Sequence, residues 1–234
     1  MGDQQSQEQH IIISCIFGNK FNKVYPAIAG KRSIFFSNNP DIASVVKKQG
    51  WEFRLVKKHP LSSDYRISSI QSKYIKFLQF FDEFPDLKDM EKITYFDHKF
   101  YVQQSHLDWI EDNLQQDKAI LIRNESRVKL SIIEEAKEAM LQNRYAETMV
   151  PTIEWITTLV KQRVISVETR IVNTGFITYQ NYNNIMPLLN DVYSKVWLLA
   201  QPECQIIWAC LSQLYSEHIQ RVEWEELNPL WQAP

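Results

Sequence analysis

The sequence predicts an α/β fold with a mostly parallel central sheet flanked by helices, and two patterns support this prediction. Several short segments are continuously apolar, which is typical of strands buried on both faces of a sheet. These segments alternate with stretches of helical periodicity, and such alternation favours parallel strands covered by helices. The 234 residues are 44% hydrophobic, which is enough to bury the core of one large domain.

The first part of the chain is predicted to follow the order β-β-α-β-α-β. Its strands cover residues 10–17, 32–36, 51–56 and 92–96. A helix over 41–49 lies between the second and third strands, with Asn39 as its N-cap, Pro40 as its first residue and Gly50 as its C-cap. A second helix, over 68–81, is predicted to open with a Ser-x-x-Gln capping box.

The second half of the chain is predicted to be mainly helical. Its helices cover residues 132–143, 148–163, 181–200 and 205–216. Ser131 and Glu134 form a capping box at the start of the first of these helices. A single strand is predicted over 170–179, and Asn173-Thr174-Gly175 interrupts it.

The domain organisation is predicted from changes in composition along the chain. We expect residues 1–9 to form a flexible leader, because this segment is polar and lacks the apolar core of a signal peptide. Residues 10–234 are expected to form a single domain with a helical insertion between 105 and 165. The segment 223–234 is rich in Trp and is expected to pack across the surface.

Composition argues against several classes of protein. The formal net charge is −2, so there is no basic excess for non-specific binding to nucleic acid. No apolar run approaches the ~20 residues that a membrane-spanning helix needs. The cysteines are few and odd in number, which indicates a reducing, cytoplasmic compartment. The motifs G-x-S-x-G, H-E-x-x-H and C-x-x-C are absent from the sequence.

The triplet Asp97-His98-Lys99 directly follows the fourth predicted strand. Ligands of open α/β sheets bind beyond the carboxyl ends of the strands, so this triplet is a candidate site. Asp97 could supply an oxygen ligand to Mg²⁺ or Mn²⁺, His98 a nitrogen ligand, and Lys99 a charge for a phosphate. Solvated charges at an ordinary strand end explain the triplet equally well. An Asp97→Asn replacement is accordingly expected to cost little stability.

Other candidate residues lie on the loops and on the second helix. Arg66 and Lys73 flank the start of that helix, where backbone N–H groups and the dipole favour an anion, although a solvated face is the default explanation for Lys73. The loops after the first two strands could hold a nucleotide through amide and aromatic groups. Their candidate residues are Phe17, Gly18, Asn19, Lys20, Ser37 and Asn38.

In the second half, each candidate has a structural explanation beside the functional one. The interruption at residues 173–175 fits a β-bulge or a close approach of a sugar to the backbone. Glu168 and Glu203 are candidate catalytic carboxylates, but surface or helix-start charges are commoner. His218 is a candidate metal ligand, yet a lone histidine is more often structural.

Four segments of the chain resemble one protein family. In order, IIISCIFGNKFNKVYP, SIFFSNN, SSIQSKYIKFLQFF and ITYFDHKF resemble the nucleotide-sugar-dependent glycosyltransferases of the GT-A fold. They look closest to the chlorovirus-type capsid glycosyltransferase domain. The resemblance covers residues 11–102 and fits the rest more loosely. It implies a nucleotide-sugar-binding half at 10–104 and an acceptor half at 105–234.

The resemblance has a specific consequence for the acidic triplet. The family carries an Asp-x-Asp motif that holds a divalent metal on the sugar diphosphate. Asp97 matches the first acid, whereas Lys99 stands in place of the second. The resemblance therefore implies either that His98 or His218 completes a metal site with Asp97, or that Lys99 neutralises the phosphate and metal dependence is weak.

The same resemblance implies a role for each remaining candidate. The two loops would hold the nucleoside, Arg66 and Lys73 would face the diphosphate, and Glu168 and Glu203 would lie near the acceptor, one of them as general base. The implied reaction moves a sugar from a nucleotide diphosphate sugar, with UDP favoured, to a glycan or glycoprotein, assisted by Mn²⁺ or Mg²⁺. Two alternatives stay open: a GT-A-like domain that binds without turnover, and a metal-dependent phosphoryl-transfer enzyme or hydrolase.

Overall fold

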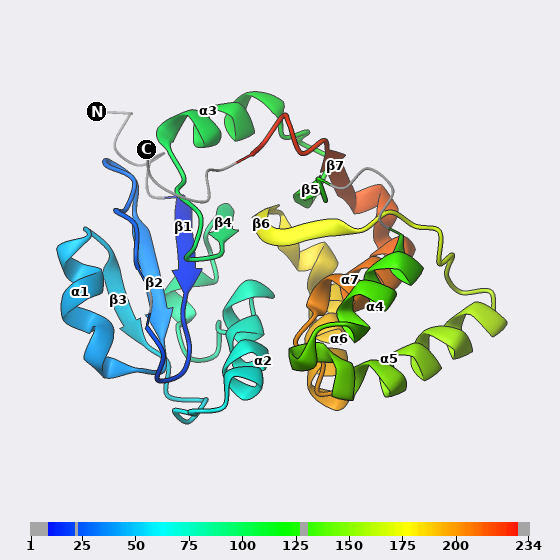
Figure 1. The fold of residues 1–234 in the computed structure, drawn as a ribbon. Coiled ribbons are helices and arrows are strands. Elements are labelled where there is room, and N and C mark those ends of the chain that lie inside the picture. Colours follow the sequence, from blue (N-terminus) through cyan, green and yellow to red (C-terminus); the bar gives the residue numbers. More distant parts are fainter. Residues whose placement is uncertain (1–8, 22, 127–130, 229–234) are drawn as a thin grey trace.

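Across the residues that the computed structural model describes, 9–21, 23–126 and 131–228, seven strands form one mixed sheet (Figure 1). They are β1 (His10–Cys15), β2 (Ser33–Ser37), β3 (Glu52–Leu55), β4 (Lys92–Phe96), β5 (Ile120–Asn124), β6 (Val172–Gln180) and β7 (Ile219–Val222). Their spatial order is β3-β2-β1-β4-β6-β5-β7. β3, β2, β1 and β4 run parallel, as do β5 and β7, whereas β6 is antiparallel to β4 and β5. The predicted mostly parallel α/β sheet is confirmed.

Helices cover both faces of this sheet. They are α1 (Ala43–Lys48), α2 (Tyr65–Lys76), α3 (Gln104–Asn113), α4 (Ile132–Met140), α5 (Asn143–Lys161), α6 (Met186–Leu198) and α7 (Cys204–Leu211). Every residue of β1 is buried, and successive side chains point to opposite faces. Ile11 and Ile13 share an apolar cluster with α2, α6 and α7, whereas Ile12 shares another with α1 and α3. A third cluster joins α4 and α5 to α7.

The strands predicted in the first part of the chain are confirmed as β1 to β4, with ends that differ by at most two residues. The predicted helix after β2 begins as a short 3-10 turn, Pro40–Ile42, and continues as α1. Asn39 is its N-cap as predicted, since its side-chain oxygen accepts the N–H of Asp41 at 3.0 Å.

The predicted start of α2 is wrong. Asp64 is the N-cap, and its carboxylate accepts a backbone N–H of the first turn at 2.7 Å. Ser68 and Gln71 lie inside the helix and donate instead to backbone carbonyls of the preceding loop. The predicted extension to residue 81 is also wrong, because Leu78 adopts a φ of 53° just after the helix ends.

The second half contains more strand than predicted. The capping box of Ser131 and Glu134 is confirmed at α4, with the N–H of Ser131 donating to Glu134 at 2.8 Å. The predicted helical insertion between residues 105 and 165 is wrong in one respect, since it contains β5. β5 carries the fully buried Arg123, whose charge interrupts the apolar pattern in the sequence. β7 was not predicted either.

The two ends of the chain are described in part. The predicted leader falls mainly on residues 1–8, which lie outside the described residues. In the predicted surface tail, Leu227 is 1% exposed and packs into the core, while residues 229–234 lie outside the described part. None of the helices in the described residues is long and apolar enough to cross a membrane.

Candidate active site

The carboxyl ends of β1 and β4 face a cleft of about 760 Å³. The loop after β1 and α2 line it on one side, and residues of α4, α5 and the start of α7 line it on the other. Its basic and acidic lining residues are Lys20, Lys73, Lys76, Asp97, His98, Lys99, Glu125, Glu135, Arg144 and Glu203. A smaller hollow of about 360 Å³ beside Tyr101 has no charged side chain in its lining. The large cleft is therefore the candidate site.

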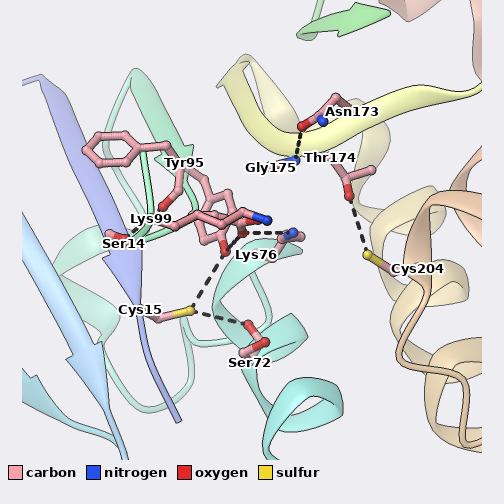
Figure 2. Close-up of polar contacts among 12 residues, drawn as sticks. Ser14, Cys15, Ser72, Lys76, Tyr95, Lys99, Asn173, Thr174, Gly175 and Cys204 are labelled. Atoms are coloured by element: carbon pink, nitrogen blue, oxygen red, sulfur yellow. Dashed lines mark hydrogen bonds and ion pairs between the residues drawn. The ribbon is translucent and has the colours of Figure 1, made fainter. Parts of the chain in front are cut away.

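Asp97 lies at the end of β4 and is held by several polar groups. The hydroxyl of Tyr95 donates to Oδ1 at 2.6 Å, and Nζ of Lys76 lies 3.1 Å from the same oxygen. Nζ of Lys99 lies 4.0 Å from Oδ2. Figure 2 shows the side chains of Tyr95, Lys76 and Lys99 close to one another near the end of β4. The backbone N–H of Asp97 donates to the carbonyl of Gly175 at 2.8 Å, which ties β4 to β6.

The pKa values in this cluster keep the acid and the lysine charged. Burial alone would raise the pKa of Asp97, but the charges of Lys76, Lys99 and Lys73 hold that pKa well below its usual value. Burial alone would lower the pKa of Lys76, yet the charge of Asp97 outweighs burial and the pKa rises. Burial, followed by the charge of Asp97, raises the pKa of Cys15 to about 12, so this thiol stays protonated at neutral pH.

Lys76 is a functional candidate that sequence reasoning missed. Helical periodicity places it with Lys73 on one polar face, and such a face is normally solvated. In the structure Lys73 is 7% exposed and Lys76 is 3% exposed. The signal for this burial was present in the sequence, because Lys76 is enclosed by the apolar residues Tyr74, Ile75 and Phe77.

The loop after β1 contributes the predicted nucleotide-binding residues that reach the cleft. They are Phe17, Gly18, Asn19 and Lys20. Gly18 has a φ of +91°, and a Cβ there would lie 2.3 Å from Oγ of Ser68, so glycine lets the loop pack on α2. Its N–H donates to Oδ1 of Asn38 at 2.9 Å. Asn38 and Ser37 are buried and do not line the cleft, so the structure gives them a supporting position under the loop.

Three other predicted site residues are not brought to the cleft. Arg66 forms an ion pair with Glu147 of α5 and is not in the lining. Glu168 is exposed on the loop before β6 and is also absent from the lining. His218 precedes β7, which runs parallel to β5 and so also to β4. It therefore lies at the opposite edge of the sheet from Asp97 and cannot share a metal ion with it.

The residues around Asp97 do not fit the expected Mn²⁺ or Mg²⁺. Within the part of the chain that the structure describes, no group of three His, Cys, Asp or Glu side chains is arranged to hold an ion. Asp97 and His98 alone offer too few ligands for ions that prefer several oxygens. The carboxylate of Asp97 also already contacts the ammonium group of Lys76.

β6 bulges between Asn173 and Ile177, beside Asp97. The register between β5 and β6 shifts here, which confirms the predicted bulge. Oδ1 of Asn173 accepts the N–H of Gly175 at 3.0 Å and fixes the turn (Figure 2). A Cβ at Gly175 would lie 2.7 Å from the ring of Phe100 and 3.0 Å from Oδ2 of Asp97. The missing side chain thus lets β6 approach the carboxylate.

A Gly175→Ala variant is expected to lower the free energy of unfolding by about 1–3 kcal/mol, because its methyl group overlaps Phe100 and Asp97. Urea denaturation measures this loss. Gly30→Ala is the control: a Cβ there meets nothing within 4 Å, so only its φ of +75° costs stability, about 1 kcal/mol. A Gly175→Ala variant as stable as the natural protein would contradict the close approach.

Carboxylates from the second half of the chain also line the cleft. Glu203 is the N-cap of α7 and accepts the N–H of Gln205 at 3.3 Å. Burial, followed by the charge of Glu203, raises the pKa of nearby Tyr145. Glu125, at the end of β5, is 8% exposed and accepts from Nδ2 of Asn173 at 3.2 Å. Sequence reasoning missed Glu125 because it missed β5. These two carboxylates are the candidate proton acceptors.

Known proteins match this chain in structure but not in sequence. No protein-family model and no curated protein matches the sequence. Mouse xyloside xylosyltransferase 1 in its apo form aligns with a TM-score of 0.52 at 10% identity, over 92% of this chain and 85% of that one. A glycosyltransferase involved in the glycosylation of the major capsid of PBCV-1 aligns with a TM-score of 0.36 at 12% identity, over 79% and 65%. 4-Diphosphocytidyl-2C-methyl-D-erythritol synthase from Anaerococcus prevotii aligns with a TM-score of 0.43 at 10% identity, over 97% and 92%.

The chain has a GT-A-like fold. The match to the xylosyltransferase carries this conclusion, because it covers nearly the whole of both chains. An identity of 10% to that glycosyltransferase supports a likeness of fold alone. The predicted GT-A fold is confirmed, whereas a closer relation to the capsid type stays a prediction.

Proposed function

We propose that this protein transfers a sugar from a nucleotide diphosphate sugar to a glycan or glycoprotein acceptor. The observation that supports this most is the lysine-lined cleft at the carboxyl ends of β1 and β4 in a GT-A-like fold. In open α/β sheets this edge is where ligands bind. UDP is the favoured nucleotide on the ground of the family resemblance alone.

The proposed donor site lies along the side of the cleft that the loop after β1 and α2 form. The loop from Phe17 to Lys20, which packs on α2 at Gly18, borders the nucleoside. Lys73 and Lys99 face the diphosphate, and an ammonium group on each side suits a chain of two phosphates. Asp97 anchors Lys76 and Lys99 at the strand end.

The proposed reaction exchanges one bond at the anomeric carbon of the sugar. The bond from that carbon to the diphosphate oxygen breaks, and its electron pair leaves with the nucleoside diphosphate. The acceptor hydroxyl oxygen forms the new bond, and its proton passes to a carboxylate of the cleft. Fixed lysine charges stabilise the leaving diphosphate as its charge develops.

A second candidate function is binding of a nucleotide sugar or glycan without turnover. The presence of Lys99 in place of a second acid, together with the pairing of Asp97 with Lys76, favours this alternative. It predicts retained binding of the nucleotide with neither sugar transfer nor hydrolysis of the donor.

The test is thermal unfolding with UDP, GDP, dTDP and CDP, followed by an assay of sugar release from the donor that contains the stabilising nucleotide. A ligand that binds only the native state at about 100 times its Kd adds about 2.7 kcal/mol, so a selective rise in Tm is expected. Release of the sugar then supports the transferase. No rise with any of the four, either with or without Mn²⁺, contradicts the proposal, and release of phosphate without sugar indicates the phosphohydrolase alternative.

Glu125 is the proposed general base. A Glu125→Gln variant is expected to lower kcat for sugar transfer by about 10²–10⁴-fold while leaving the Kd of the nucleoside diphosphate unchanged. Glu203→Gln is expected to have a smaller effect, because that carboxylate caps α7. Glu168→Gln is the control outside the cleft and is expected to have none. A larger loss for Glu203→Gln than for Glu125→Gln would assign the base to Glu203.

A further inference from the structure

We propose that the cleft binds the diphosphate of its nucleotide without a divalent cation, with Lys73 and Lys99 supplying the charge that a metal ion would otherwise supply. This inference rests on the proposed nucleotide-sugar function and specifies how the same site works. Lys76 has a different part, as the internal counter-ion that fixes Asp97.

The first step is that Asp97 is already neutralised. Its Oδ1 accepts from Tyr95 and lies 3.1 Å from the ammonium of Lys76, and its Oδ2 lies 4.0 Å from that of Lys99. Because Lys76 is 3% exposed, its ammonium cannot move into water to make room for another cation. A divalent ion at this carboxylate would lie next to a buried positive charge, which Coulomb repulsion opposes.

The second step is that the ammonium group of Lys73 has no direct hydrogen-bond or ion-pair partner among the described residues. This lysine lines the cleft and is 7% exposed. Such a cation is costly to bury. Ser69 and Ser72, which also line the cleft, place hydroxyl groups on the same helix. A phosphate beside Lys73 would give this cation the anion that the protein itself does not supply.

The third step is the charge balance of this wall. Lys20, Lys73, Lys76 and Lys99 carry four positive charges and Asp97 carries one negative charge, so this wall has an excess of positive charge. A nucleotide diphosphate sugar carries one negative charge on each of its two phosphates, which such an excess attracts. Of the acidic residues in the lining, Glu125 follows β5, Glu135 lies on α4 and Glu203 is the N-cap of α7.

The experiment measures by calorimetry the binding of UDP, or of GDP, dTDP or CDP if one of these stabilises the protein instead. Each titration is made once in EDTA and once with Mn²⁺ or Mg²⁺. The Kd is expected to change less than about threefold between these conditions. Lys73→Ala is expected to raise the Kd of the nucleoside diphosphate about tenfold or more, because a charged hydrogen bond is lost. The Kd of the nucleoside without phosphates is expected to change less than about threefold. Lys73→Arg is expected to restore much of the loss. Lys47→Ala, on the exposed end of α1, is the control and is expected to have no effect.

The outcomes separate this inference from the function on which it rests. Binding that appears only with Mn²⁺ or Mg²⁺ overturns the metal-free site and leaves the nucleotide-sugar function standing. Equal loss of diphosphate and nucleoside in Lys73→Ala also overturns it, since the lysine then has no phosphate role. Absence of binding by all four nucleoside diphosphates in every condition overturns the proposed function, and this inference with it.

Discussion

Replacing Asp97 by asparagine is expected to lower the free energy of unfolding by about 3–5 kcal/mol. The change removes the negative charge 3.1 Å from Nζ of Lys76 and leaves an uncompensated ammonium in a side chain that is 4% exposed. The sequence alone suggested little loss of stability, because it could not show that the partner of Asp97 is buried. Urea denaturation at neutral pH measures the difference.

The double variant Asp97→Asn/Lys76→Met is the matched control for this prediction. It removes both charges and keeps an unbranched side chain at residue 76, so it is expected to recover most of the stability lost by the single variant. A single variant within about 1 kcal/mol of the natural protein would show that the pair is not buried as described. Both variants are expected to lose sugar transfer, since each removes the anchor at the end of β4.

Stability is also expected to fall as the pH is lowered from neutral towards about pH 5. Burial lowers the pKa of His10 below 6.5, while its ring nitrogens contact Glu111 at 2.8 Å and Thr94 at 2.9 Å. Burial likewise lowers the pKa values of His59, His98 and His106. The unfolded chain therefore binds protons first as the pH falls. This contribution to stability is fully present above about pH 6.5 and is lost as the pH falls towards the folded-state pKa values.

Urea denaturation at several values between about pH 7.5 and pH 5.5 measures this dependence. A His10→Gln variant is expected to show a shallower decrease, because one of the contributing groups is gone. A free energy of unfolding that is flat or rises towards acid would contradict the assignment of neutral, buried histidines.

The fold could be predicted from the sequence where local signals agree with the tertiary structure. β1 and β4 are continuous apolar runs because both of their faces are covered by helices. Asn39 and Ser131 are caps whose partners lie within three residues. The predicted start of α2 was wrong because Asp and Ser are both favourable N-cap residues. Only tertiary packing selects Asp64 over Ser68. β5 was missed because the buried Arg123 stacks on Phe100 and Trp224, far away in the sequence.

The candidate site could be predicted only where position along a strand was enough. Asp97 follows β4 and lies at the cleft, as its place at a strand end suggested. Lys76 takes its role from a partner on another element, so helical periodicity alone assigned it to a solvated face. His218 was grouped with Asp97 because the order and direction of the last strands could not be read, and the sheet places it at the other edge.

The measurement that tests the central claim most directly is a crystal structure of the protein with the nucleoside diphosphate that stabilises it, in the presence of EDTA. The account predicts the nucleoside beside the loop from Phe17 to Lys20, and both phosphates within hydrogen-bond distance of Lys73 or Lys99. Phosphates bound away from these lysines, or a nucleotide bound outside the cleft at the carboxyl ends of β1 and β4, would contradict it.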